Sequence, residues 1–567
     1  MSGSDRVHLD TDVLIIGSGA AGMSAAIAAH DQGARVLLAD RSLIGRGGAT
    51  VMAQMTVAAA VGDEVPDDPG HHLADTLKAG RGLCDERLSA SLCEEAPDAI
   101  RQMQAWNVGW ARHDDGRLRQ VEAPGHDRPR CVYVDFLNTG PAVSRTLRAQ
   151  VQRRNAILRI GDLMIADIVA AEGAASGAVG FSVSDGRAVS IAARATIIAT
   201  GGLTRLYARN SASLNMGGDG YALGARAGAE LIDMEFVQFF PIGHLAPRLV
   251  GMDPIMWDPF RYKLGGRLLN GAGNEFIDRY GVPEHDRYVA PRDVATYAIV
   301  KEIEAGRSSP AGGVYLSFQH LPEGRLREAF GPVIDRLAAN GIDLTKKPVE
   351  VAPIAHYHMG GLRVGSSFET RVAGLFAAGE AVGGANGANR LSGNAITEAL
   401  VFGRRAGVSA AAWARGGAGW EERVAGEALA LVSARSPERQ ANCAQLIARL
   451  QRLMSDQVGP FRTAKGLSAA LAEIALMKRD MGERPPGAPG AFRPERLDWF
   501  DARNMVLVAE AVATAALARA ESRGAHQRED FPASDPGWAR HQIAAVEARG
   551  DDLRLSLAGA PEAVAAQ

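Results

Sequence analysis

The feature that most constrains the fold of this chain is a glycine-rich turn between an apolar strand and a helix of small residues. Residues 12–16 are mostly apolar, residues 17–22 read Gly-Ser-Gly-Ala-Ala-Gly, and residues 20–30 are mostly alanine. A second apolar run at 35–40 completes a β-α-β unit within about 30 residues. Glycines in such a turn let backbone N–H groups approach a pyrophosphate at the N-terminus of the helix. The motif therefore predicts a Rossmann-like dinucleotide-binding domain.

Two features favour FAD over NAD as the dinucleotide. Two later apolar strands, at 195–199 and 374–378, end in Thr200-Gly201-Gly202 and Gly379-Glu380, as expected when a nucleotide domain resumes after insertions. A second glycine-rich run, 45–50, follows the second strand, where a flavin needs close backbone contact. Asp40, which ends that strand, is placed to accept a hydrogen bond from a ribose hydroxyl. The predicted FAD contacts are Gly17, Gly19, Ala20, Ala21, Gly22, Asp40, Arg41, Gly48, Ala49, Thr50, Ala53, Thr200, Gly201, Asp219, Glu380, Asn394 and Ile396.

Composition along the chain predicts an α/β fold in four segments. Residues 1–235 and 352–415 form a two-part FAD-binding domain, and residues 236–351, richer in aromatics, turns and charges, form an inserted α+β capping domain. Residues 416–567 form a C-terminal helical domain and tail, because Ala, Leu, Arg and Glu recur there at helical spacing. Past Arg540 we expect a peripheral helix and a frayed end.

Charge and cysteine content exclude several classes of protein. A formal net charge of −3 gives no basic field for nucleic acid. Four cysteines without C-x-x-C spacing indicate a reduced compartment and no zinc module or iron–sulfur cluster within the chain. The first 11 residues lack the apolar stretch of a signal peptide, and no run of about 20 apolar residues occurs. These features predict a soluble, cytoplasmic protein.

Six ordered motifs carry a resemblance to a known family. They are 218–220 followed by 233–239, then 290–294, 356–361, 377–380, 387–394 and 521–526. In these motifs the chain resembles the flavoprotein subunits of succinate dehydrogenase and fumarate reductase, with their relatives L-aspartate oxidase and adenylylsulfate reductase. The resemblance runs nearly from end to end. It implies hydride transfer between flavin N5 and the carbon β to a carboxylate of an organic acid.

The resemblance also implies roles for four side chains. Arg292 would deliver the substrate proton through a relay, since a free arginine hardly ever loses one. A cation at a helix N-terminus is mildly unfavourable, which is consistent with a function for this arginine. Arg390 would bind the substrate carboxylate with its planar guanidinium, together with His356. Glu380 would accept hydrogen bonds from the ribityl or ribose hydroxyls of the flavin.

The chain departs from the family pattern at positions that bear on the cofactor and the substrate. Ala49 stands where members with covalent flavin carry a histidine, so we expect non-covalent FAD. Phe240 and Ile242 replace residues of the family's Gln-Phe-His-Pro-Thr-Gly motif, and Asn386 replaces a common histidine. The stretch that holds the second carboxylate of a dicarboxylate is replaced by residues 257–266. We therefore predict a substrate other than succinate or fumarate, with one carboxylate and an apolar or aromatic part.

Other interpretations of the sequence stay open. Arg261 or Lys263 could anchor a second acid group, and the electrons could pass to oxygen, a soluble carrier, or an iron–sulfur or ferredoxin-like partner. An L-aspartate oxidase-like amino-acid oxidase and a flavoprotein subunit of an adenylylsulfate reductase-like complex are alternative enzymes. A flavin-binding electron carrier or regulatory protein without substrate chemistry is an alternative of another class.

Overall fold

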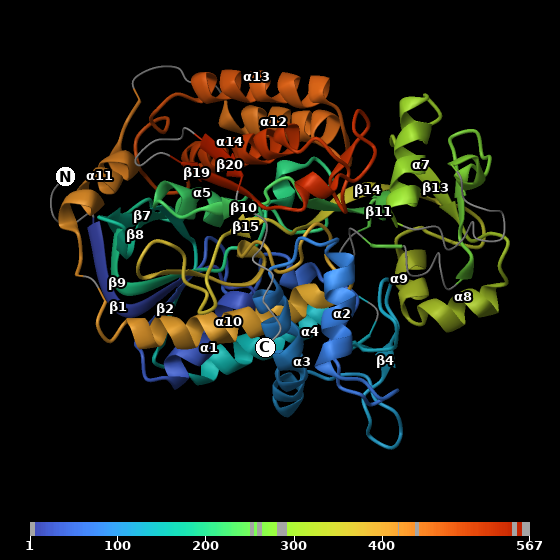
Figure 1. Cartoon of the computed structure of the whole chain (residues 1–567), viewed down its shortest axis with the longest axis horizontal. Coiled ribbons are helices and arrows are strands. Elements are labelled where there is room, and N and C mark those ends of the chain that lie inside the picture. The colour runs from blue at the N-terminus through green and yellow to red at the C-terminus, as the bar shows by residue number, and fades with distance from the viewer. Residues whose placement is uncertain are drawn as a thin grey trace.

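The structure is a computed structural model of the whole chain (Figure 1). It describes residues 6–135, 137–249, 255–257, 264–280, 292–417, 419–436, 442–546 and 553–557, without the side chains of 292, 293 and 555–557. The short elements not discussed below are η1 (Thr50–Met52), β3 (Val57–Ala58), β4 (Gln120–Val121), β5 (Cys131–Val132), η2 (Thr204–Leu206), η3 (Ile277–Tyr280), β17 (Phe461–Arg462), β18 (Gln527–Arg528) and η6 (Pro536–Trp538).

The main sheet contains every strand that the sequence predicts for the nucleotide domain. Its order is β6-β2-β1-β9-β8-β7, with β16 also paired to β9. The neighbours β6, β2, β1, β9 and β16 are parallel, whereas β7 and β8 form an antiparallel extension. Parallel strands are covered on both faces, which explains why they appear in the sequence as continuous apolar runs. The bounds are β1 (Arg6–Ile16), β2 (Val36–Ala39), β6 (Ile157–Ile160), β7 (Leu163–Ala171), β8 (Ala174–Ser182), β9 (Ala188–Ile198) and β16 (Leu375–Ala377).

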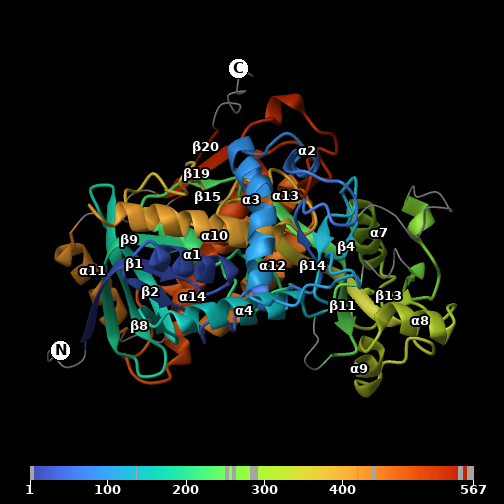
Figure 2. The same ribbon diagram turned by 90° about the horizontal axis from the view of Figure 1, so that it is seen from below.

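Two helices from distant parts of the sequence lie side by side against this sheet (Figure 2). They are α1 (Ala20–Asp31), which follows the glycine-rich turn, and α10 (Asn394–Trp413). A Cβ at Gly403 would lie 2.4 Å from the carbonyl oxygen of Ala21, so glycine permits the close packing of the two helices. The helices α2 (Pro69–Ala79), α3 (Glu86–Ala105), α4 (Thr139–Arg153) and α5 (Asp219–Arg226) complete the domain.

The inserted segment forms a separate α+β lobe, seen at the right of Figure 1. Its sheet has the order β11-β14-β13-β12 and its own buried core around Trp257, Phe276 and Phe318. β14 continues to His358, beyond the boundary expected at residue 351. The lobe contains β11 (Val237–Ala246), β12 (Arg267–Leu269), β13 (Val314–Ser317), β14 (Val349–His358), α7 (Arg292–Glu304), α8 (Glu323–Phe330) and α9 (Val333–Ala339).

The C-terminal region is helical, as predicted, but its tail is not. α11 (Glu422–Ser433), α12 (Cys443–Gln457), α13 (Ala464–Met481) and α14 (Pro494–Ala518) are followed by the strands β19 (Gln542–Val546) and β20 (Leu553–Leu557). The prediction of a helix past Arg540 is therefore wrong. β19 pairs with β10 (Leu231–Ile232), which in turn pairs with β15 (Gly361–Leu362), so the tail satisfies backbone groups of a buried strand.

A buried arginine joins this C-terminal region to the start of the inserted lobe. Arg519 donates to Glu235 at 2.5 Å and to Glu521 at 3.0 Å, and all three side chains are fully buried. Its guanidinium also lies over the ring of Phe236, 4.9 Å from the centroid. Glu235 and Phe236 immediately precede β11, so this arginine anchors the chain where it enters the lobe.

The four cysteines, Cys84, Cys93, Cys131 and Cys443, are all buried, and in the described part of the chain none of them forms a disulfide. Burial raises the pKa of the first three thiols to about 12 and that of Cys443 to about 11. Within the described ranges, we find neither a group of side chains suited to hold a metal ion nor a helix long and apolar enough to cross a membrane.

Candidate active site

A cavity lies at the carboxyl ends of the parallel strands, where ligands bind in open α/β sheets. It encloses about 1250 Å³ of space, part of which is open to solvent. Its walls come from the turns after β1, β2, β9 and β16, and from the first turns of α10. The two predicted parts of the nucleotide domain therefore meet around one cavity.

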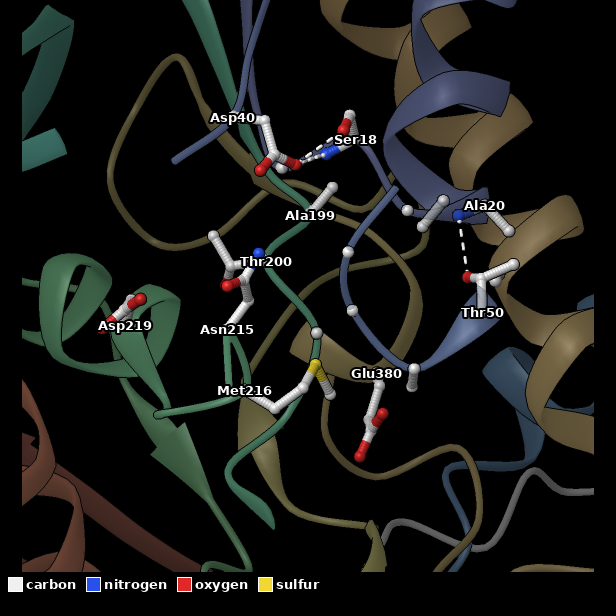
Figure 3. A pocket seen from close by; sticks show the side chains of 18 of the residues that line it. Ser18, Ala20, Asp40, Thr50, Ala199, Thr200, Asn215, Met216, Asp219 and Glu380 are labelled. Carbon is white, nitrogen blue, oxygen red and sulfur yellow. Dashed lines mark hydrogen bonds between the residues drawn. The ribbon is translucent and has the colours of Figure 1, made fainter. Parts of the chain in front are cut away.

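The glycine-rich turn forms one wall of this cavity (Figure 3). Gly17 has φ +103°, and a Cβ on it would lie 2.4 Å from the carbonyl oxygen of Ala199. Thr50 accepts a hydrogen bond from the Ala20 N–H at 3.0 Å, which ties the second glycine-rich run to the start of α1. No acidic side chain occupies the first turn of α1, so its positive end is available to an anion. These features fit a pyrophosphate.

Asp40 holds two turns of the cavity wall together. One carboxylate oxygen accepts from the Ser18 N–H at 2.8 Å and from its hydroxyl at 2.6 Å, and the other accepts from the N–H and hydroxyl of Ser42 at 2.8 and 2.9 Å. A carboxylate offers about four lone-pair sites, and these four bonds occupy them. The ribose contact predicted for Asp40 thus stays a prediction that would need one of these bonds to be exchanged.

A cationic group and a histidine lie at the other end of the cavity. The Arg390 guanidinium is 4.4 Å from the centroid of the Tyr357 ring and donates to the side-chain oxygen of Gln238 at 3.1 Å. His356 is held through Nδ1 by the hydroxyl of Ser211 at 2.8 Å. Arg390, His356, Tyr357 and Ser211 all line the cavity, so this end can receive a carboxylate.

An apolar cluster adjoins this acid-binding end. Phe240, Met256 and Ile354 pack together and are buried, and Met256 also lines the cavity. The Phe240 ring lies edge-on to the His356 ring, with centroids 5.6 Å apart. The Phe240 ring therefore borders one side of His356 with hydrocarbon, which offers no hydrogen-bond donor to a second carboxylate.

Glu380 provides an acceptor in the wall of the cavity. Its carboxylate accepts from the His358 N–H at 3.0 Å, and burial raises its pKa to about 8. His358 itself is fully buried between the Tyr221 hydroxyl and the Met234 carbonyl, and burial lowers its pKa to about 4. We infer that His358 is a neutral, structural side chain.

A family model described as an FAD binding domain matches residues 12–396, and another, described as the C-terminal part of the fumarate reductase flavoprotein, matches residues 447–564. The chain belongs to the fumarate reductase and succinate dehydrogenase flavoprotein family. It is accordingly an FAD-dependent oxidoreductase, and the cavity is the candidate site for its FAD. The geometry agrees, because a cavity of about 1250 Å³ with the glycine-rich turn in its wall can hold this dinucleotide.

Individual members of the family are similar over nearly the whole chain. The chain is 36% identical over 534 residues to a component of the fumarate reductase (CoM/CoB) of Methanothermobacter marburgensis, covering 94% of this chain and 96% of that protein. It is 32% identical over 540 residues to an L-aspartate oxidase of Streptomyces coelicolor, covering 94% and 91%. The solved structure of Mycobacterium smegmatis Sdh1 with UQ1 superposes with a TM-score of 0.89 at 33% identity, covering 98% and 95%.

Most predicted site residues line this candidate FAD cavity, and three need separate comment. Gly22 lies one turn into α1 and packs against Gly17, while the Asn394 side chain bonds His72 and Thr76 behind the wall. Arg292 begins α7, but its side chain lies outside the described residues. The lining residues are Gly17, Gly19, Ala20, Ala21, Asp40, Arg41, Gly48, Ala49, Thr50, Ala53, Thr200, Gly201, Asp219, His356, Glu380, Arg390 and Ile396.

Sequence reasoning did not single out several other residues of the wall. They are Ser18, Met52, Leu163, Met164, Ile165, Ser211, Asn215, Met216, Met256 and Tyr357. Ser18 stands within the glycine-rich turn and Tyr357 within the 356–361 motif, so their neighbours were a usable signal. Residues 163–165 belong to an ordinary apolar strand, and nothing in their pattern distinguishes them from core.

Replacing Gly22 by alanine is expected to empty the FAD site. A Cβ at this position would lie 1.8 Å from the carbonyl oxygen of Gly17, so the glycine-rich turn would have to move. We expect purified Gly22→Ala protein to contain less than about a tenth of the FAD of the wild type, measured by absorbance at the flavin maximum. Gly426→Ala on α11, where the residue is exposed, has no positive φ and a Cβ would meet no atom within 4 Å, is the control and should keep its FAD.

Proposed function

We propose that this flavoenzyme oxidises or reduces a CH–CH bond of an organic acid that carries one carboxylate and an apolar or aromatic part. FAD, when bound, supplies the acceptor or donor of the hydride. The substrate proposal rests on one observation. Arg390 and His356, which can bind a carboxylate, lie next to an apolar cluster of Phe240, Met256 and Ile354. The FAD is proposed to be non-covalent, since Ala49 in the cavity wall offers no atom for a bond.

Each residue of the acid-binding end has a physical role in this proposal. Arg390 and His356 bind the carboxylate, and Ser211 fixes the orientation of the imidazole through its hydrogen bond at 2.8 Å. They also stabilise the negative charge that develops beside the carboxylate during the reaction. The apolar cluster accommodates the rest of the substrate and excludes water. Arg292, at the start of α7, exchanges the proton at the α carbon through a relay.

Anaerobic bleaching of the FAD absorbance by a panel of saturated acids tests this function. We expect 3-phenylpropionate and related acids to bleach the oxidised protein faster than succinate. Fumarate reduction should have a kcat/KM below about 10⁴ M⁻¹s⁻¹, and Phe240→His should improve the preference for fumarate by about tenfold or more by restoring a polar partner. Efficient reduction of fumarate by the wild type would show that the substrate proposal is wrong.

The similarity to an L-aspartate oxidase supports a second candidate, an amino-acid oxidase that transfers electrons to oxygen. Hydrogen peroxide formed during aerobic turnover with L-aspartate would favour it over the first proposal. For the CH–CH enzyme, we propose that electrons pass to a separate soluble or iron–sulfur protein in the cytoplasm. Relatives named as the flavoprotein subunits of succinate dehydrogenases support this, because such a name implies that the flavoprotein works within an assembly.

A further inference from the structure

A buried carboxyl that faces no part of the cavity lies behind the proposed carboxylate-binding arginine. Glu398, in the second turn of α10, is fully buried. One of its oxygens accepts from the Tyr357 hydroxyl at 2.7 Å and from the Asn386 amide at 2.6 Å. The ring of the same Tyr357 contacts the Arg390 guanidinium, which lies 4.4 Å from the ring centroid. A continuous path thus runs from the carboxyl through Tyr357 to the cation.

We propose that Glu398 is a positioning residue that takes up a proton when an organic acid binds to Arg390. In the free protein, the buried charge of Arg390 is balanced in part by an ionised Glu398. A substrate carboxylate that pairs with Arg390 neutralises the charge of this arginine. An ionised Glu398 behind Tyr357 then becomes unfavourable. The carboxyl then binds a proton. This inference rests on the proposed function of Arg390 as the carboxylate-binding residue.

The surroundings of Glu398 support a carboxyl that titrates. Burial raises its pKa to about 7, while the hydrogen bonds from Tyr357 and Asn386 and the charge of Arg390 act in the opposite direction. Its second oxygen, Oε1, has no hydrogen-bond partner among the described residues, and neither has the Asn386 amide oxygen. A proton would convert one of these buried acceptors into a donor.

Among the described residues, few other charged or titratable groups surround Glu398. Arg390 and Tyr357 face it as described, Glu380 stands in the cavity, and Tyr221 approaches from α5. Burial raises the pKa of both tyrosines well above the usual value, so they stay protonated near neutral pH. Glu380, with a pKa of about 8, is the competing site for the proton and must be tested beside Glu398.

The sign of the pH dependence follows from linkage. If binding raises the pKa of Glu398, the complex holds more protons than the free protein. Affinity for the acid is then highest below about pH 7 and falls as the pH rises above it, by up to about tenfold in Kd per unit.

The test uses FAD-saturated, oxidised protein under anaerobic conditions, with cinnamate and fumarate as the two probe acids, because these unsaturated acids cannot reduce the oxidised flavin and so report binding alone. Calorimetric titration at pH 8 in buffers of different ionisation enthalpy counts the protons taken up on binding, and Kd is measured from pH 6 to 9. We expect the wild type to take up a fraction of a proton approaching one. Glu398→Gln, which keeps an acceptor for Tyr357, should take up almost none and should bind with a flat pH profile.

Three variants separate the possible outcomes. Tyr357→Phe removes a donor to the anion, so the pH at which Kd begins to rise should move upward by about one unit; an unchanged profile contradicts the proposal. Proton uptake that survives Glu398→Gln but disappears in Glu380→Gln assigns the proton to Glu380 and overturns it. If Arg390→Ala binds acid as the wild type does, or if neither acid binds the wild type, the underlying function of Arg390 is itself wrong. FAD content and melting temperature verify that each variant is folded.

Discussion

Replacement of Arg292 by alanine is expected to lower kcat by about 10²–10⁴-fold while FAD stays bound, which is the range that a positioned acid–base group contributes. The residue begins α7 in the inserted lobe, whereas the residues predicted to contact FAD belong to the two nucleotide-binding segments. Its loss should therefore leave the absorbance spectrum and the FAD content unchanged. Steady-state kinetics on the acid identified by the bleaching panel, with the FAD content of each preparation measured, provide the comparison.

Lys301→Ala is the matched control for this experiment, because it removes a cation from the same helix at its other end. Lys301 pairs with Glu304 and Glu529, so its loss tests the attachment of the lobe without touching the reacting atoms. We expect Lys301→Ala to stay within about tenfold of the wild type. If Arg292→Ala also stays within about tenfold, Arg292 does not deliver the proton.

Arg519→Ala is expected to cost about 3–5 kcal/mol of folding free energy, the largest effect on stability that we predict. The change would leave the buried carboxylate of Glu235 without the cation that pairs with it, whereas Glu521 would keep its pair with Arg523. It would also remove the cation that lies over Phe236. Urea unfolding followed by circular dichroism and FAD fluorescence measures the loss in the transition that involves the C-terminal region.

The control for Arg519 is Arg327→Ala, which removes a cation from an exposed ion pair on α8. Arg327 donates to Glu323 at 2.8 Å and to Asp335 at 3.0 Å, and the three side chains are all more than half exposed. Exposed pairs contribute about 0–1 kcal/mol. A similar loss from both variants would mean that the buried network does not hold the C-terminal region to the entry of the lobe.

The fold could be predicted wherever local pattern and long-range packing require the same structure. The strand at 12–16, the glycine-rich turn and the helix from Ala20 specify each other over a few residues, and the structure places all three as expected. The tail could not be predicted in this way. Residues 542–546 are rich in alanine and helix-compatible by propensity, but they form β19 because Leu231 and Ile232, more than 300 residues earlier, need a strand beside them.

In the candidate site too, groups that are close in the sequence could be predicted and contacts between distant residues could not. The glycine-rich turn and the motif around Arg390 each lie in one continuous stretch, so the sequence identifies them directly. The supports of these groups come from far away: Ser211 holds His356 across 145 positions, and Tyr357 reaches Glu398 across 41. For Asp40, the spacing predicts a contact with a ribose, but it does not predict the hydrogen bonds that both carboxylate oxygens accept from Ser18 and Ser42.

The burial of all four cysteines has a practical consequence for the chemistry of the folded protein. Only a thiolate reacts readily with maleimides or disulfide reagents, and these four thiols are both inaccessible and held in the protonated form. The native chain should therefore be unreactive toward such reagents until it unfolds. A cysteine introduced on the surface of the inserted lobe would then be the sole labelled position, and its fluorescence could report the motion of that lobe without removal of any natural residue.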